Sequence, residues 1–264
     1  MTNPAELEHE THQQAPEDPV HPEALRFMGV RYTYPDGVEA LKDIAFHVHP
    51  GEKVALLGPN GAGKSTLMLT SNGILEPTAG YIEIDGQRLN RKNLADARRF
   101  IGLVFQDPED QLFMKTVFDD VAFGPRNAGL SSEEVTRRVS TSLEAVGLSG
   151  IESRSAIHLS FGQKKRVALA TVLSLDAQML ILDEPSSNLD PRARREMIDL
   201  LQNLSSTMLI ATHDMDLAWE LCPRTIIMND GHIIADGVTK KLLTHHETLT
   251  ANGLEVPSYV RYCL

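Results

Sequence analysis

The segment GPNGAGKST, residues 58–66, constrains the fold of this chain more than any other segment. It matches the pattern G-x-x-x-x-G-K-[ST], and we call it the phosphate loop. The apolar run KVALLG leads into it, and an amphipathic segment begins at its Ser65, which is the strand–loop–helix context that the pattern requires. Glycines allow such a loop to curl until successive backbone N–H groups face one anion. The sequence therefore predicts a buried strand that ends in a loop for the phosphates of a nucleotide.

The residues of the phosphate loop have separate tasks in this prediction. Lys64 is expected to reach the β- and γ-phosphates as a point charge, and Ser65 is expected to offer its hydroxyl to Mg²⁺. The remaining positions expected to bind the nucleotide are Gly58, Asn60, Gly61, Ala62, Gly63 and Thr66.

A second apolar run, MLILDEP at residues 179–185, contains two acids after its last apolar residue. A hydrophobic strand that delivers Asp183 to its tip is how proteins with such a loop hold Mg²⁺. Glu184 is expected to point to the opposite face, where it could polarise an attacking water. Many kinases and switch GTPases with the same loop lack this second acid. Glu184 therefore favours hydrolysis of ATP by a fixed base.

Short apolar runs alternate with helical segments along most of the chain. IGLVF and TMLIATH resemble KVALLG in ending close to polar residues, and buried strands that alternate with helices predict a parallel α/β sheet. Ligands bind at the carboxyl ends of the strands of such a sheet, where these polar residues fall. LRFMGVRYTY, ALKDIAFHVH and YIEI alternate in the manner of strands and predict an additional antiparallel layer.

Composition and spacing divide the chain into three parts. Residues 1–24 hold six acids, four Pro and no Lys or Arg, which predicts a flexible acidic tail. Residues 25–237 form the predicted nucleotide-binding domain, in which FDDVAFG and SSEEVTRRVSTSLEAVGL show helical spacing and predict a helical subdomain at about 107–160. TIIMNDGHIIADG predicts a hairpin, and residues 238–264 are expected to form a short helical extension that includes KKLLTHHETLTANG.

Charge and cysteine usage exclude several classes of protein. The net charge of −11 argues against a nucleic-acid partner, and the basic run KKR that begins at Lys164 is expected to lie on a solvated helix face. Cys222 and Cys263 have no metal-type spacing and suggest a reducing cytosol. No apolar run approaches the roughly 20 residues of a membrane helix, and no secretory signal is expected. His47 and His49 share a strand face, but nothing nearby completes a metal site.

Six features together resemble the ATP-binding subunit of an ABC transporter. In chain order these are the phosphate loop, Gln106 after IGLVF, LSFGQ at 159–163, the acids Asp183 and Glu184, SNLD at 187–190 and His213 after LIAT. Their order and spacing are similar to those of the family over about residues 25–237. The resemblance implies an α/β fold of the ABC-type P-loop NTPases, with a parallel core sheet, an antiparallel β layer and a helical subdomain.

The resemblance also implies roles for the matched residues. Tyr34 resembles the aromatic residue that stacks on adenine; Tyr32 is a second candidate, and a buried core position is the alternative for both. Gln106 resembles the residue that senses Mg²⁺ and the attacking water. Glu184 resembles the general base, and His213 resembles the switch residue that contacts the γ-phosphate.

LSFGQ, which we call the signature loop, resembles the family motif that completes the ATP site of a second subunit. The resemblance implies a head-to-tail dimer of two copies, in which Ser160, Gly162 and Gln163 face the partner's nucleotide and Asp190 contacts the partner. Phe161 stands where the family usually has Gly. We expect the phosphate contact to survive this change and the loop to be stiffer, with Phe161 available to pack between subunits.

The segments DPEDQLF, VAFGPRNAGL and QKKRVALA narrow the resemblance. They are similar to the energy-coupling-factor importers, and most to the CbiO-like ATPases of the cobalt and nickel branch. This implies an ATPase at the cytoplasmic face of the membrane that uses ATP and Mg²⁺. Integral membrane subunits would contact the segment after Gln106, including Leu112, Phe113 and Met114, although these apolar residues could equally be plain core.

Other readings of the sequence stay open. Segments like DPEDQLF also occur in vitamin importers, so a vitamin-type energy-coupling-factor ATPase is an alternative. A soluble ABC protein without transport is another, but DNA-repair members carry a long coiled coil and ribosomal members usually have two cassettes. A P-loop kinase is a further alternative, but the signature loop has no role in such a kinase. Co-purification with membrane proteins would separate the transport reading from the others.

Overall fold

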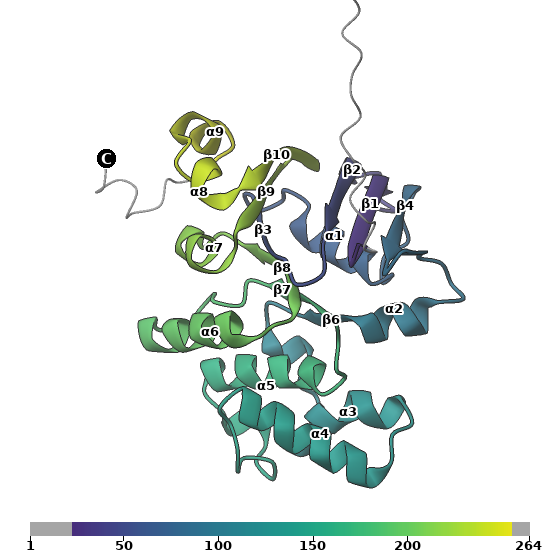
Figure 1. Cartoon of the computed structure of the whole chain (residues 1–264), viewed down its shortest axis with the longest axis vertical. Coiled ribbons are helices and arrows are strands. Elements are labelled where there is room, and N and C mark those ends of the chain that lie inside the picture. Colours follow the sequence, from purple (N-terminus) through teal and green to yellow (C-terminus); the bar gives the residue numbers. More distant parts are fainter. Residues whose placement is uncertain (1–22, 255–264) are drawn as a thin grey trace, which may run out of the picture.

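A six-stranded sheet forms the centre of the protein, as seen in the computed structural model, which describes residues 23–254 (Figure 1). The strand order is β10-β9-β3-β8-β7-β6, and every neighbouring pair is parallel except β9 with β10. The strands are β3 (Lys53–Leu57), β6 (Ile101–Val104), β7 (Met179–Asp183), β8 (Thr207–Thr212), β9 (Arg224–Asn229) and β10 (His232–Val238). The buried parallel strands predicted from the apolar runs are therefore confirmed.

The parallel strands are apolar throughout because both of their faces are covered. Side chains of β3 alternate between two cores. Ala55 and Leu57 pack among the helices on one face, whereas Val54 and Leu56 pack against the antiparallel layer on the other. All four side chains have no solvent exposure. The central sheet is thus held between two separate hydrophobic layers.

The antiparallel layer is a second sheet with the order β2-β1-β4-β5, as the alternating segments predicted. Phe27 of β1 faces Phe46 of β2, and their stacked rings lie 4.8 Å apart between centroids. Helix α1 packs on the inner side of this layer and α2 leads into β6. The bounds are β1 (Leu25–Thr33), β2 (Glu39–Val48), β4 (Ala79–Ile84), β5 (Gln87–Arg88), α1 (Lys64–Ser71) and α2 (Leu94–Phe100).

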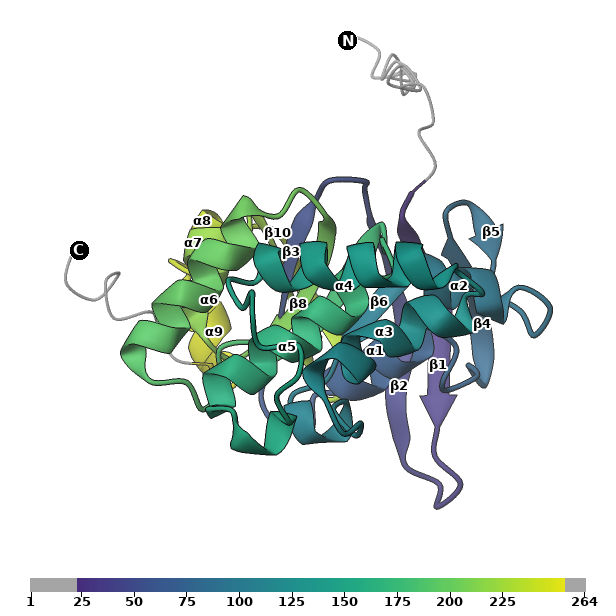
Figure 2. The same ribbon diagram turned by 90° about the horizontal axis from the view of Figure 1, so that it is seen from below.

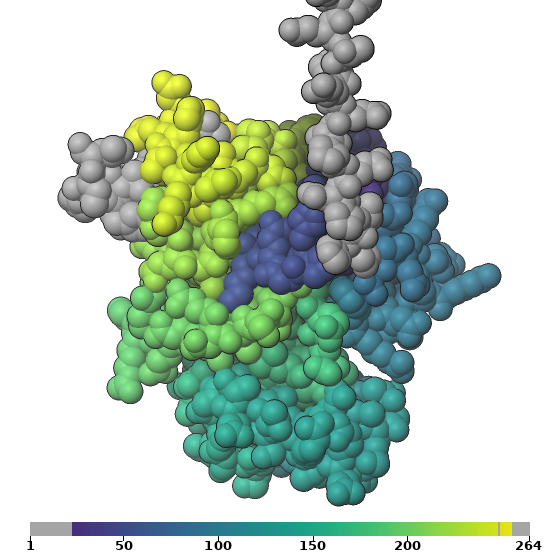
Figure 3. Space-filling model, viewed as in Figure 1, coloured from purple at the N-terminus to yellow at the C-terminus, as the bar shows by residue number. Residues whose placement is uncertain are grey.

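Helices α3, α4 and α5 pack together on the other face of the central sheet, opposite the antiparallel layer. They form the teal lobe at the bottom of Figures 1 and 3. Figure 2 shows them side by side, with α6 and α7 continuing across the same face of the sheet. The α3 and α4 helices begin where Thr116 and Ser131 accept hydrogen bonds from the backbone N–H groups of Asp119 and Glu134. The elements are α3 (Val117–Asn127), α4 (Ser132–Ala145), α5 (Phe161–Leu173), α6 (Pro191–Asn203), α7 (Met215–Leu221) and the 3₁₀ turns η1 (Pro108–Asp110) and η2 (Ala156–His158).

The described part of the C-terminal extension, which ends at Leu254, contains two short helices after a hairpin. The predicted hairpin is confirmed, since β9 and β10 meet at Asp230 and Gly231, which both have positive φ. After it the chain forms two short helices, α8 (Thr239–Leu242) and α9 (His246–Ala251). Leu243 and Leu249 are both fully buried, but their spacing would place them on different faces of one continuous helix. The break between α8 and α9 lets both leucines reach the core.

Within residues 23–254, no helix has both the length and the apolar character needed to cross a bilayer.

The same range contains no group of three or more His, Cys, Asp or Glu side chains placed to hold a metal ion. His47 and His49 contact each other edge to face, with 4.7 Å between ring centroids, and His47 lies 3.9 Å from a carboxylate oxygen of Glu23.

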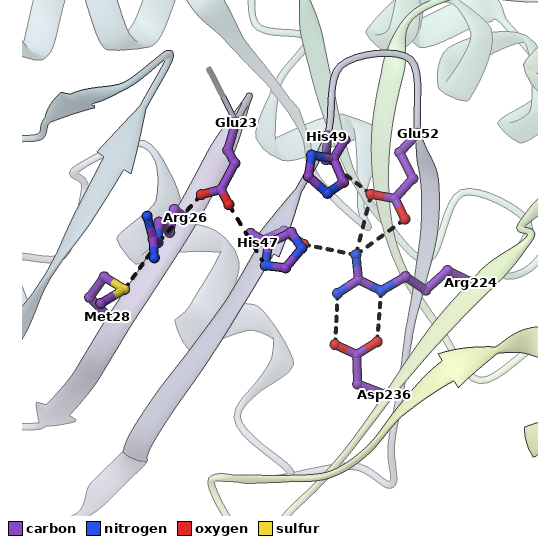
Figure 4. Close-up of polar contacts among 8 residues, drawn as sticks. All are labelled: Glu23, Arg26, Met28, His47, His49, Glu52, Arg224 and Asp236. Atoms are coloured by element: carbon purple, nitrogen blue, oxygen red, sulfur yellow. Dashed lines mark hydrogen bonds and ion pairs between the residues drawn. The ribbon is translucent and has the colours of Figure 1, made fainter. Parts of the chain in front are cut away.

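Arg224, the first residue of β9, joins the central sheet to the antiparallel layer (Figure 4). Its guanidinium makes two 2.7 Å hydrogen bonds to the carboxylate of Asp236 and two, of 3.1 and 3.3 Å, to the carboxylate of Glu52. It also donates a 3.0 Å hydrogen bond to the carbonyl oxygen of His47. Hydrogen bonds to the two acids raise the pKa of Arg224, with burial acting in the opposite direction. One side chain thus connects β2, the β2–β3 turn, β9 and β10.

We expect Arg224→Ala to lower the free energy of unfolding by about 2 kcal/mol, because hydrogen bonds from the mostly buried guanidinium to Glu52, Asp236 and the His47 carbonyl oxygen would be lost. Urea unfolding of the variant measures this loss. Arg91→Ala is the matched control, since Arg91 pairs with Glu76 at a fully exposed position and should change stability within experimental error. Equal effects of the two substitutions would show that the Arg224 network does not hold the layers together.

Candidate nucleotide site

A pocket of about 990 Å³ lies where the loops after β3, β6, β7 and β8 converge. These strands are parallel neighbours, so their carboxyl ends meet at one edge of the sheet. The structure brings thirteen of the predicted site residues to this pocket. They are Tyr34, Gly58, Asn60, Gly61, Ala62, Gly63, Lys64, Ser65, Thr66, Gln106, Asp183, Glu184 and His213.

The phosphate loop is held tightly against the sheet. A Cβ atom at Gly58 would lie 2.4 Å from the carbonyl oxygen of Met228 in β9, and one at Gly63 would lie 2.5 Å from that of Ala40. Gly63 also has a φ of 101°, which a residue with a side chain rarely adopts. Only glycine fits these two positions. The loop then enters α1, whose first backbone N–H groups are free to face an anion.

Lys64 crosses the interior of the phosphate loop. Its ammonium donates hydrogen bonds of 2.6 Å to the carbonyl oxygen of Gly58 and 3.1 Å to that of Pro59. Burial lowers the pKa of Lys64, while the charges of Glu184 and Asp183 act to raise it. A positive charge is thereby fixed at the floor of the pocket, which suits it to an anionic ligand.

Tyr34 lies on one wall of the pocket, next to the exposed side chain of Val38. The Tyr34 hydroxyl is 3.0 Å from Oγ1 of Thr66, and its ring meets the Tyr32 ring edge to face. Tyr32, by contrast, is buried in the core below the antiparallel layer. Of the two tyrosines, Tyr34 is therefore the one that borders the pocket.

Asp183, Ser65 and Gln106 place carboxylate, hydroxyl and amide oxygens on the lining of the pocket. Oγ of Ser65 donates a 3.3 Å hydrogen bond to Oδ2 of Asp183, and Gln106 lies on the pocket lining. Burial, followed by the negative charge of Glu184, raises the pKa of Asp183. Two adjacent carboxylates with a hydroxyl and an amide oxygen nearby are a donor set that fits a hard cation such as Mg²⁺.

Glu184 lies in the same pocket as Asp183, contrary to the expectation that it would point to the opposite face. The reason is that β7 ends at Asp183 and Glu184 has a φ of 46°, so the chain turns instead of continuing as a strand. Oε2 of Glu184 accepts hydrogen bonds from the Thr212 hydroxyl at 3.1 Å and the His213 backbone N–H at 3.3 Å. Oε1 lies 2.8 Å from Nδ1 of His213. The carboxylate is therefore fixed at the end of β8.

The signature loop and Asp190 lie outside this pocket. The Ser160 hydroxyl accepts the backbone N–H of Gln163, whose side chain in turn accepts the Ser160 N–H, so the two form a capping box at the start of α5. A Cβ at Gly162 would lie 3.2 Å from that of Ala193 in α6. Asp190 caps α6 through two 2.9 Å hydrogen bonds to backbone N–H groups. Within one chain, these residues do not reach the phosphate loop.

The composition of the basic run after the signature loop predicted a solvated helix face. The structure contradicts this for one of its residues. Lys165 is only 4% exposed, because its ammonium finds acceptors in the loop after β7. Phe161 also packs within its own chain, with Nζ of Lys165 lying 5.6 Å from the ring centroid.

Several pocket residues have no recognisable sequence signal. Val38 and Ala40 line it from the antiparallel layer, and Gly253 and Leu254 line it from the C-terminal extension. Their positions depend on how distant segments pack, for which the local sequence gives no pattern. Asp214 has a clearer signal, since it follows His213 and caps α7 by accepting the backbone N–H of Leu217.

Comparison with known proteins identifies the family. Residues 41–187 match the family model described as ABC transporter. The chain is 51% identical over 234 residues to a Streptomyces avermitilis protein named as an ABC transporter ATP-binding protein, covering 89% of each. It is 48% identical to the energy-coupling factor transporter ATP-binding protein EcfA of Methanosphaera stadtmanae, covering 86% of this chain and 83% of the relative.

Solved structures share the fold, and two of them illustrate the likeness to this chain. One is cbiO1 of Clostridium perfringens, described as part of the ABC transporter complex cbiONQ, with 39% identity, a TM-score of 0.78 and coverage of 91% of this chain and 98% of that one. The other is an ATP-binding cassette solved as a dimer in a post-hydrolysis state with ADP and phosphate, with 28% identity, a TM-score of 0.74 and coverage of 81% and 98%. This chain belongs to the ABC transporter family and is one of its ATP-hydrolysing subunits.

Proposed function

We propose that this protein is the ATPase of an energy-coupling-factor importer and that it powers the uptake of cobalt, with nickel as the second candidate. The observation that carries the catalytic part is the fixed carboxylate of Glu184 inside the phosphate-loop pocket. The EcfA name of the relatives and the cbiONQ description of the structural neighbour support the importer type. The DPEDQLF and LSFGQKKR segments favour the cobalt and nickel branch.

ATP binds with its phosphates in the phosphate loop and its adenine against Tyr34 and Val38. The Lys64 ammonium and the first N–H groups of α1 hold the phosphates. Ser65, Gln106 and Asp183 would hold Mg²⁺ beside them. When bound, Mg²⁺ neutralises charge that develops on the phosphate oxygens. The raised pKa of Asp183 agrees with this assignment, because a buried carboxylate pair favours a nearby cation.

Glu184 acts as the general base for hydrolysis. Its carboxylate orients the attacking water and accepts a proton from it, while the Thr212 hydroxyl and the His213 N–H keep Oε2 in place. His213 is 67% exposed, so its ring can reach a γ-phosphate while Nδ1 stays beside Oε1 of Glu184. Hydrolysis removes the γ-phosphate and with it the group that His213 contacts.

Each ATP is held between two copies of the chain. The signature loop presents Ser160, Gly162 and Gln163 on a surface away from its own phosphate loop, and a head-to-tail partner would bring them to the second nucleotide. Asp190 begins α6 next to this surface. ATP that contacts both copies stabilises the closed dimer by the free energy of the added contacts, and hydrolysis reverses the closure. The dimeric cassette with bound ADP and phosphate supports this arrangement.

The segment after Gln106 transmits this motion to integral membrane subunits. Gln111 ties it to α5 through hydrogen bonds to the Ala168 carbonyl and the Thr171 hydroxyl. Phe113 is 63% exposed and meets Phe123 edge to face, with 5.1 Å between ring centroids. Exposed neighbouring aromatic side chains of this kind are typical of a surface that a partner covers.

We propose accordingly that the protein is a peripheral subunit at the cytoplasmic face of the membrane. A vitamin-type importer would use the same ATPase chemistry, because the transported substrate contacts the membrane subunits. A nucleic-acid partner is disfavoured by the net charge of −11.

Glu184→Gln should keep nucleotide affinity and lower kcat by a factor of about 100 to 1000, because the amide cannot accept the proton from water. Phosphate release measures the rate, and size-exclusion chromatography with ATP should show a trapped dimer. Glu76→Gln, an exposed carboxylate outside the pocket, is the control and should hydrolyse normally. A Glu184→Gln variant with near wild-type turnover would contradict the assignment of the base.

Uptake by the reconstituted complex tests the transported substrate. The chain is co-expressed with the membrane proteins encoded beside it, and labelled Co²⁺ or Ni²⁺ is offered to vesicles that contain ATP on the ATPase side. We expect uptake of Co²⁺ that stops with Glu184→Gln. Uptake of a vitamin without either metal would replace the cobalt assignment and leave the ATPase mechanism intact.

A further inference from the structure

Lys165 is a buried cation that the mechanism above does not use. It lies on the second turn of α5 and donates a 2.5 Å hydrogen bond from Nζ to the backbone carbonyl oxygen of Glu184. A second hydrogen bond, of 3.0 Å, reaches the hydroxyl of Ser187. Burial lowers the pKa of Lys165 to about 8, against the opposing effect of the nearby charges of Glu184 and Asp183.

The carbonyl group that Lys165 contacts belongs to a residue in an unusual conformation. Glu184 has a φ of 46°, in the left-handed region that residues with side chains rarely adopt. Its carbonyl oxygen also accepts the Ser187 backbone N–H at 3.1 Å and the Ser187 hydroxyl at 2.9 Å. Three donors thus converge on one oxygen. They fix the peptide group that follows Glu184, the residue whose carboxylate lies in the pocket.

Burying an ammonium is costly, so Lys165 is not explained by packing alone. The apolar side chains of Val104, Leu169, Leu182 and Met197 surround a small gap beside it, and an apolar residue would suit them equally well. Phe161, one helical turn earlier, lies over the ammonium at 5.6 Å. This contact gives a role to the phenylalanine that replaces the usual glycine of the signature loop.

We propose that Lys165 is a positioning residue that holds Glu184 in its hydrolytic orientation and links the signature loop of a subunit to that subunit's own base. The inference rests on the proposed role of Glu184. Ser160 and Gln163 start the same helix that carries Lys165, so a displacement of α5 on contact with the partner's ATP also moves the Lys165 ammonium. Each nucleotide therefore influences the base of the opposite site.

Lys165→Met tests this role, because methionine has a similar length and suits the apolar surroundings. We expect kcat to fall about tenfold, because a tenfold change corresponds to the loss of one hydrogen bond from a charged donor. The KM for ATP should stay unchanged. The cooperativity of hydrolysis with ATP concentration should also fall. Lys164→Met is the matched control: Lys164 is the preceding lysine of α5 and pairs with the exposed Glu109 at 2.5 Å, so its loss should leave basal turnover within twofold of wild type.

A double-mutant cycle separates positioning from general loss of structure. If Lys165 acts through Glu184, adding Lys165→Met to Glu184→Gln should cause no further loss of turnover. If the two substitutions instead lower turnover by independent factors that multiply, the proposal is overturned. A Lys165→Met variant with wild-type kcat would also overturn it. So would a variant whose thermal unfolding temperature is so low that the loss of kcat merely follows the loss of folded protein. Normal turnover by Glu184→Gln alone would instead refute the assignment of the base.

Discussion

The site depends on the ends of four neighbouring parallel strands meeting at one edge of a buried sheet. β3 delivers the phosphate loop, β7 delivers Asp183 and Glu184, β8 delivers Thr212 and His213, and β6 leads to Gln106. The strands are covered on both faces, so their order and register are set by the two hydrophobic layers. The phosphate loop is equally constrained, since Gly58 and Gly63 lie against backbone carbonyl groups of β9 and β2.

Hydrogen bonds connect the loop after β7 and the loop after β8 to helices α5 and α6. Lys165 reaches the loop after β7 from α5, and Arg194 of α6 makes two 2.7 Å hydrogen bonds to Asp214, which follows His213. Ser186 donates a 3.0 Å hydrogen bond to the same carboxylate. We infer that these hydrogen bonds allow a contact made at the signature loop to change the position of Glu184 in the same subunit, and so to affect hydrolysis.

Most of the fold and much of the pocket could be predicted because they depend on local patterns. The apolar runs identified β3, β6, β7 and β8, and the fixed spacing of the phosphate loop identified Lys64 and Ser65. The positive φ of Glu184 and the burial of Lys165 could not be predicted, because each depends on contacts between separate elements. The break between α8 and α9 and the approach of Leu254 to the pocket likewise follow from tertiary packing.

We propose that each ATP site combines the phosphate loop of one copy with the signature loop of another. Mixing two inactive variants tests it directly: Lys64→Ala disables the phosphate loop and Ser160→Phe blocks the signature loop. Each variant alone should be inactive, because neither homodimer contains an intact site. In the mixture, a heterodimer contains one intact site, formed by the phosphate loop of the Ser160→Phe copy and the signature loop of the Lys64→Ala copy. ATP hydrolysis should therefore return. A mixture as inactive as its separate components, with heterodimers shown to form, would contradict the shared site.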